Sequence, residues 1–169
     1  MKKQNITYIV FSIFALILVF APSVFAATTS TVTATVTAQN VSVSVSDGTI
    51  SYGTLATDAN NDTTTSGLND SQTATNGGNI NVDFNILGQD SAIWTLGGTT
   101  GVDIYTHKFC TTDCDSSPSW TALTTSYQTL SSSVSESGTQ DFDLQIGTPT
   151  STTEYTEQSV DVTVQAVAS

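Results

Sequence analysis

Basic side chains are nearly missing from this sequence. It has no arginine and only three lysines, Lys2, Lys3 and Lys108, against 15 aspartates and glutamates. Proteins that bind nucleic acid or anionic lipid neutralise phosphate groups with lysine and arginine. The composition therefore argues against nucleic acid as a partner. The acidic balance is typical of a soluble surface that attracts cations.

Residues for nucleophilic catalysis are also scarce. His107 is the only histidine, and no Gly-x-Ser-x-Gly motif accompanies it. Because His107 alternates with Tyr105 and Phe109, we expect a packed strand residue rather than a general base.

Glycosidase chemistry needs two carboxylates that face each other across a cleft. The closest pairs in the sequence are Asp141 with Asp143 and Asp113 with Asp115. We expect Asp141 and Asp143 to share one strand face in solvent. The sequence therefore predicts no catalytic residues and no enzyme.

Cysteine occurs twice, in the segment Cys110-Thr-Thr-Asp-Cys114. In an exported chain two close cysteines are expected to form a disulfide. A zinc site would need two more soft ligands, and one histidine cannot complete it.

Only one long apolar run is present, and it lies at the N-terminus. Lys2 and Lys3 precede apolar residues 8–20, and small residues flank a cleavage position after Ala26. This order is typical of a secretory signal peptide. We predict a signal peptide at 1–26, one domain at 27–169 without a transmembrane segment, and a secreted protein at the cell surface.

Apolar residues of the mature chain alternate with polar ones, which indicates half-buried strands. The pattern predicts strands around 32–38, 41–45, 50–52, 80–86, 93–96, 104–110, 142–146 and 160–166. The phase changes at residues 39–40, so 32–45 is either one bulged strand or two strands. Residues 57–79 read as a long surface loop with one weak strand near 71–75.

No stretch of the mature chain has a helical apolar stripe. About eight or nine short strands separated by turn residues indicate an all-β fold. We predict a single β-sandwich, immunoglobulin-like or jelly-roll-like, with a barrel as the alternative.

One segment has oxygen-bearing side chains at alternate positions, as the start of a calcium loop does. These residues are Asp58, Asn60 and Asp62. A flexible acidic loop is the competing interpretation, because the loop's usual glycine and glutamate are replaced by Thr63 and Asn69.

Three segments carry a resemblance to a known family: residues 47–53, Trp94-Thr95-Leu96, and the closing strand at 155–166. Together they resemble secreted WxL-type bacterial surface proteins. Residues 76–84 and 138–144 are similar to immunoglobulin-like surface modules. The resemblance implies a β-rich domain that associates non-covalently with the cell wall.

The chain also resembles TasA and camelysin-type fibre subunits, in which an N-terminal strand completes the sheet of the next subunit. Residues 31–38 would be this donor strand, since they alternate cleanly and directly follow the signal peptide. Pairing of residues 31–38 within their own domain is the alternative.

We therefore expect a non-enzymatic structural or adhesive surface protein that needs no cofactor, unless calcium binds. Its partners would be a cell-wall polymer, other surface proteins or further copies of itself. A self-assembling fibre subunit and a carbohydrate-binding module are the alternatives. Trp94 and Trp120 are the aromatic side chains best suited to contact a ligand, although a tryptophan of a sandwich also often lies in the core.

Overall fold

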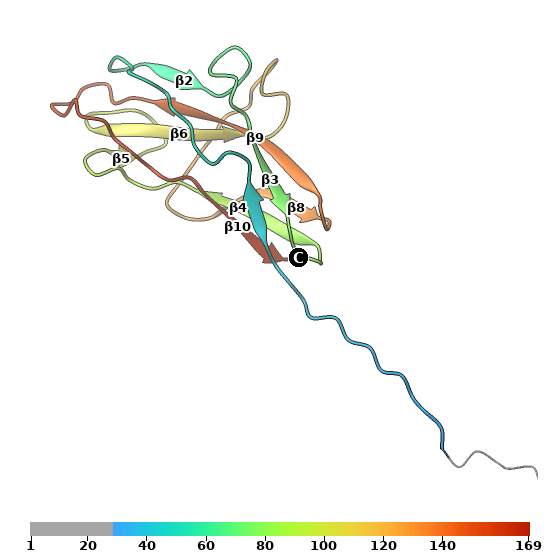
Figure 1. Cartoon of the computed structure of the whole chain (residues 1–169). Helices are drawn as coiled ribbons and strands as arrows, with labels where there is room; N and C mark the ends of the chain where they lie inside the picture. The colour runs from blue at the N-terminus through green and yellow to red at the C-terminus, as the bar shows by residue number, and fades with distance from the viewer. Residues whose placement is uncertain (1–28) are drawn as a thin grey trace, which may run out of the picture. The chain divides into compact units, whose positions relative to one another are not determined.

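The computed structural model describes residues 29–169 (Figure 1). The chain divides into two units, Met1–Thr37 and Ala38–Ser169. The predicted signal peptide lies outside the described residues. Of the first unit, residues 29–37 form neither helix nor strand, and every side chain among them is exposed.

The second unit is built from strands alone. They are β1 (Val43–Val45), β2 (Asn60–Asp62), β3 (Gln72–Asn76), β4 (Val82–Leu87), β5 (Thr95–Leu96), β6 (Ile104–Cys110), β7 (Thr121–Ala122), β8 (Gln128–Val134), β9 (Thr139–Gly147) and β10 (Thr163–Ala168). Between residues 29 and 169 there is no helix, and so none long and apolar enough to cross a membrane. The predicted all-β class is confirmed.

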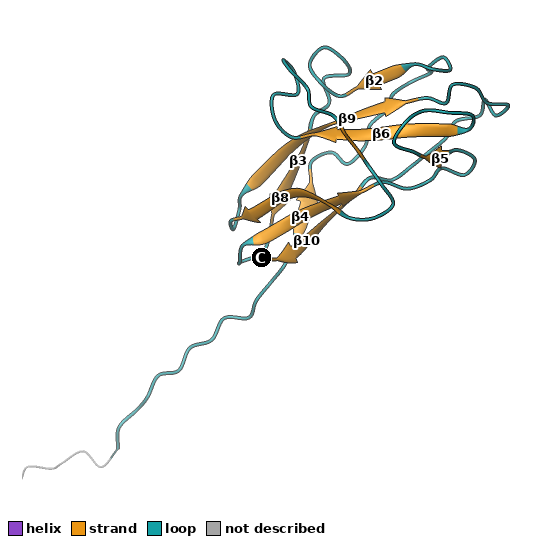
Figure 2. Cartoon of the chain, turned by 180° about the vertical axis from the view of Figure 1, so that it is seen from behind, coloured by secondary structure: helices purple, strands orange, loops and turns teal. Residues whose placement is uncertain are grey.

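Two sheets of unequal size form the sandwich (Figure 2). The larger sheet has the order β1-β3-β9-β6-β5, with β2 paired to β9 and β7 paired to β6. The smaller sheet has only the order β10-β4-β8. All pairs are antiparallel except β5 with β6.

The alternation of apolar and polar residues along the strands explains which side chains form the core. Every second residue of β4 is fully buried, and these are Val82, Phe84 and Ile86. They pack against Phe142 and Leu144 of β9 on the opposite sheet. Each such side chain contributes about 1.5–3 kcal/mol when it leaves water, so this contact between sheets stabilises the sandwich.

The interpretation of residues 57–79 as a long surface loop is wrong, whereas the weak strand expected near 71–75 is confirmed as β3. They include β2 and β3, and β3 lies inside the larger sheet between β1 and β9. Its inward residues are Gln72, Ala74 and Asn76, which are small or polar and so gave a weak apolar signal. Hydrogen bonds compensate the buried polar groups, because the Asn76 amide donates to the Ile80 and Val134 carbonyls.

Two predicted strands are missing from the ladders. Neither 31–38 nor 50–52 pairs with any other segment within residues 29–169, and the strand predicted across 41–45 is formed only at β1. Alternating apolar and polar residues favour a strand. A strand is formed, however, only where a second backbone segment lies alongside and hydrogen-bonds with it.

Candidate functional site

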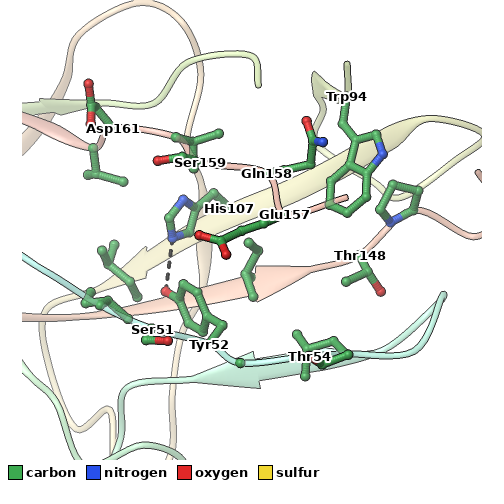
Figure 3. A pocket seen from close by; sticks show the side chains of 18 of the residues that line it. Ser51, Tyr52, Thr54, Trp94, His107, Thr148, Glu157, Gln158, Ser159 and Asp161 are labelled. Carbon is green, nitrogen blue, oxygen red and sulfur yellow. Dashed lines mark hydrogen bonds between the residues drawn. The ribbon is translucent and has the colours of Figure 1, made fainter. Parts of the chain in front are cut away.

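A groove of about 1180 Å³ opens along one side of the sandwich. Two extended segments border it, residues 50–57 and residues 154–162, which we call the wall segments (Figure 3). Ser51, Tyr52 and Thr54 belong to the first wall segment, and Glu157, Gln158, Ser159 and Asp161 belong to the second. Phe142, Leu144 and Ile146 of β9 line the groove between them.

The lining combines an apolar part with polar and charged residues of the wall segments, among them Glu154, Glu157 and Asp161. Besides the three β9 residues, its aliphatic side chains are Val45, Ile50, Leu55, Val160, Val162 and Val164. Such a surface favours an occupant with small apolar side chains.

The backbone of both wall segments lacks backbone partners, although the Tyr52 and Ala56 carbonyls accept side-chain hydrogen bonds from Asn61 and Thr148. Neither forms a backbone–backbone hydrogen bond to any other part of residues 29–169. The groove also lies beside the free edges of the two sheets, since β1 and β10 each end the strand order of their sheet. Unpaired strand edges are templates for another strand.

His107 lies at the base of the groove and is 3% exposed. Its Nε2 and the Tyr52 hydroxyl are hydrogen-bonded at 3.1 Å, as Figure 3 shows. Its Nδ1 is buried and has no hydrogen-bond partner within the described chain. Burial lowers the pKa of His107 to about 4, so the ring is neutral at pH 7. The expectation of a packed strand residue is confirmed.

Tyr52 is kept as a neutral phenol in the same place. Its pKa is raised by burial first, and then by the charges of Asp62, Asp70 and Asp143. A neutral phenol and a neutral imidazole make a structural contact between β6 and the first wall segment.

The tryptophans lie in different places. Trp94 is half-buried at the groove, and its indole Nε1 donates to the Thr152 hydroxyl at 3.2 Å. Its ring centroid is 6.5 Å from that of Tyr105. Trp120 is half-buried directly before β7 and does not line the groove. A role in ligand contact remains a prediction for both.

The predicted disulfide between Cys110 and Cys114 is present, with its Cα atoms 5.8 Å apart. It closes a short loop at the end of β6. The Asp115 carboxylate, directly after this loop, accepts hydrogen bonds from the Thr65 amide at 2.7 Å and the Thr65 hydroxyl at 2.9 Å. The disulfide loop is therefore joined to the loop after β2.

The candidate calcium residues do not converge on one point. Asp58 is exposed and has a φ of 58°, whereas Asn60 and Asp62 belong to β2. The Asp62 carboxylate accepts hydrogen bonds from the Thr64 amide and hydroxyl. Across residues 29–169 no three His, Cys, Asp or Glu side chains are grouped to hold a metal ion. Calcium binding here remains a prediction.

The interpretation of Asp143 as a solvent-facing carboxylate is wrong. Asp143 is only 7% exposed, whereas Asp141, two residues earlier on β9, is exposed as expected. Asp143 accepts hydrogen bonds from the hydroxyls of Thr63 at 2.8 Å and Ser71 at 2.6 Å. The chain after β2 covers the middle of β9, which strand periodicity alone does not reveal.

The wall segments were the part of the site that sequence reasoning missed. Their strand pattern was visible at Ile50 and Tyr52 and at Val160 and Val162, but both were expected to be paired. In the structure they are extended and unpaired. The fold and the groove together give a β-sandwich in which two unpaired segments border a groove.

No protein-family model, curated protein or solved structure matches the chain.

Proposed function

We propose that this protein is a non-enzymatic structural subunit of the cell surface that assembles into fibres by strand exchange. Residues 31–38 of one copy would fill the groove of the next copy. The observation that carries this proposal is that three segments with strand patterns, residues 31–38 and the two wall segments, are all without a strand partner.

The donor segment has the side chains that the groove requires. Val32 and Val36 are 94% and 96% exposed, so two branched apolar residues face water. With Ala34 and Ala38 they form one apolar face, and threonines form the other. Insertion would bury the apolar face on the half-buried groove residues Ile146, Val160 and Val162 and leave the threonines toward solvent.

Backbone hydrogen bonds would add to this burial. An inserted strand lies between two wall segments that each offer unpaired amide and carbonyl groups. β-Strand addition obtains affinity from such main-chain bonds and specificity from the alternate side chains.

The contact would repeat in one direction. The donor segment joins the domain at Ala38, next to Asn79 in the β3–β4 turn, whereas the groove is bordered by residues 50–57 and 154–162. Donor and acceptor are different surfaces, so the contact is heterologous and extends into an open filament. The predicted signal peptide and the resemblance to WxL-type and TasA-type surface proteins support a surface location. The resemblance also suggests the cell-wall polymer as a further partner.

Size-exclusion chromatography with light scattering tests the proposal. Residues 27–169 should form polymers, and residues 39–169 should remain monomeric, each with and without calcium. If both stay monomeric at high concentration, strand exchange is refuted and cell-wall binding becomes the next assay.

A matched pair of variants tests which face of the donor inserts. Val32→Asp with Val36→Asp should reduce polymer formation at least about 100-fold, because two carboxylates would enter an apolar groove. Thr33→Asp with Thr35→Asp adds the same charge on the other face and should still polymerise. Equal behaviour of the two variants would contradict the proposed orientation.

A further inference from the structure

The chain is held at the point where it enters the sandwich. Asn79, in the turn between β3 and β4, accepts a hydrogen bond from the Asn40 amide through its Oδ1 at 2.8 Å. Its Nδ2 donates to the Ala38 carbonyl at 2.8 Å, and its own amide donates to the Asn40 carbonyl at 3.1 Å. We call these three bonds the Asn79 clamp.

The turn is shaped to receive this segment. A Cβ atom at Gly78 would lie 2.4 Å from the Asn40 carbonyl oxygen, so only glycine permits the approach. The Gly77 amide also donates to the Ser42 carbonyl at 3.1 Å. Residues 38–42 therefore follow the turn as an extension of β1.

The clamp sets how far the donor segment reaches within its own copy. From Asn40 the chain runs antiparallel to β3, where Val43 pairs with Asn76 and Val45 pairs with Ala74. Val45 is the first residue along the chain that lines the groove. Ala38 and Val45 are seven residue steps apart, which is about 23 Å at a strand rise of ~3.3 Å per residue.

The donor segment has no length to spare over this distance. Residues 31–38 also span seven residue steps and reach at most about 25 Å when fully extended. If the segment folded back from Ala38, residue 31 would arrive only near Val45. The donor segment itself would then not enter the space between the wall segments.

We infer that the Asn79 clamp prevents a copy from filling its own groove and so directs strand exchange to a second copy. This inference rests on the proposed function and names Asn79 as the positioning residue. Without the clamp, a reversal at residues 40–42 would lengthen the available reach. Part of the donor segment could then enter its own groove and compete with assembly.

The test compares Asn79→Ala with Asn40→Ala in the chain 27–169. Asn40 contributes only backbone atoms to the clamp, so Asn40→Ala is a matched control that keeps all three bonds. For Asn79→Ala, we expect the concentration of monomer in equilibrium with polymer to rise on the order of fivefold to tenfold. Asn40→Ala should keep the wild-type value.

Hydrogen exchange on dilute monomers supplies a second readout. Amides of the wall segments should exchange fast in wild type and in Asn40→Ala, and slowly in Asn79→Ala, whose groove is partly filled from within. If wild type polymerises and Asn79→Ala matches it in both measurements, the inference is overturned and the proposed function stands. If wild type does not polymerise, the proposed function fails and the inference fails with it.

Discussion

Individual buried polar residues hold the chain after β2 against the larger sheet. Thr63 is fully buried; its hydroxyl donates to Asp143 and accepts from the Leu144 amide at 2.9 Å. Each bond contributes about 1 kcal/mol, and an unpaired buried group would cost more than that. Residues that look like loop residues in the sequence therefore hold the middle of β9 in place.

His107 makes stability depend on pH. Its pKa is about 4 in the folded protein and near 6.5 when unfolded, so the unfolded chain binds the proton more readily. Its contribution is complete above pH 6.5 and is lost as the pH falls toward 4. Urea unfolding of wild type should show a loss of up to about 3 kcal/mol from this residue over that range.

A substitution separates the effect of His107 on stability from that of the carboxylates, which also titrate in acid. His107→Gln has no charge change, so its free energy of unfolding should fall less steeply between pH 6.5 and pH 4. Lys108→Gln serves as the control and should keep the wild-type slope. Identical slopes for His107→Gln and wild type would show that burial of the imidazole is not the cause.

At the scale of elements, a strand pattern and a strand are different things. β4 and β6 have both the alternating pattern and a neighbour on each side. Residues 31–38 and the wall segments have the pattern and no neighbour. Elements that are ready to pair but unpaired are the ones available for a second chain.

The loop after β6 is the element that the disulfide stabilises. Replacing Cys110 and Cys114 together with serine should lower the free energy of unfolding by about 2 kcal/mol, because a closed loop of this length restricts the unfolded chain modestly. Urea denaturation measures the difference. Wild type in reductant should coincide with the double variant, and an unchanged midpoint in both would contradict a stabilising role.

At the scale of the whole molecule, the net negative charge would oppose the proposed assembly. Residues 27–169 contain all 15 acidic residues and the single lysine Lys108, so copies repel one another. Three of these carboxylates, Glu154, Glu157 and Asp161, belong to a wall segment.

Salt should therefore speed polymer formation. Raising ionic strength from about 0.01 M to about 0.15 M shortens the Debye length from about 30 Å to about 8 Å, which screens repulsion between approaching copies. Light scattering at pH 7 should record faster growth, and equal ionic strengths of NaCl and NaBr should act alike. A rate that does not respond to salt would mean that charge does not limit the encounter.

The amino-acid sequence alone determines the all-β class, the strands centred on β4, β6, β9 and β10, and the disulfide. The strands follow from the alternation of apolar and polar residues, and the disulfide follows from two cysteines close in the chain. Both can be predicted from the sequence because each depends only on residues that are near one another in it.

Only the tertiary structure decided which strand patterns are paired. It placed β3 inside a sheet despite its polar sequence, buried Asp143 under residues 63–71, and left residues 31–38 and both wall segments without partners. Strand pairing joins backbone segments that are far apart in the chain. The alternation of side chains in one segment does not tell whether a second segment lies beside it. The groove is for this reason a property of the fold and not of any one segment.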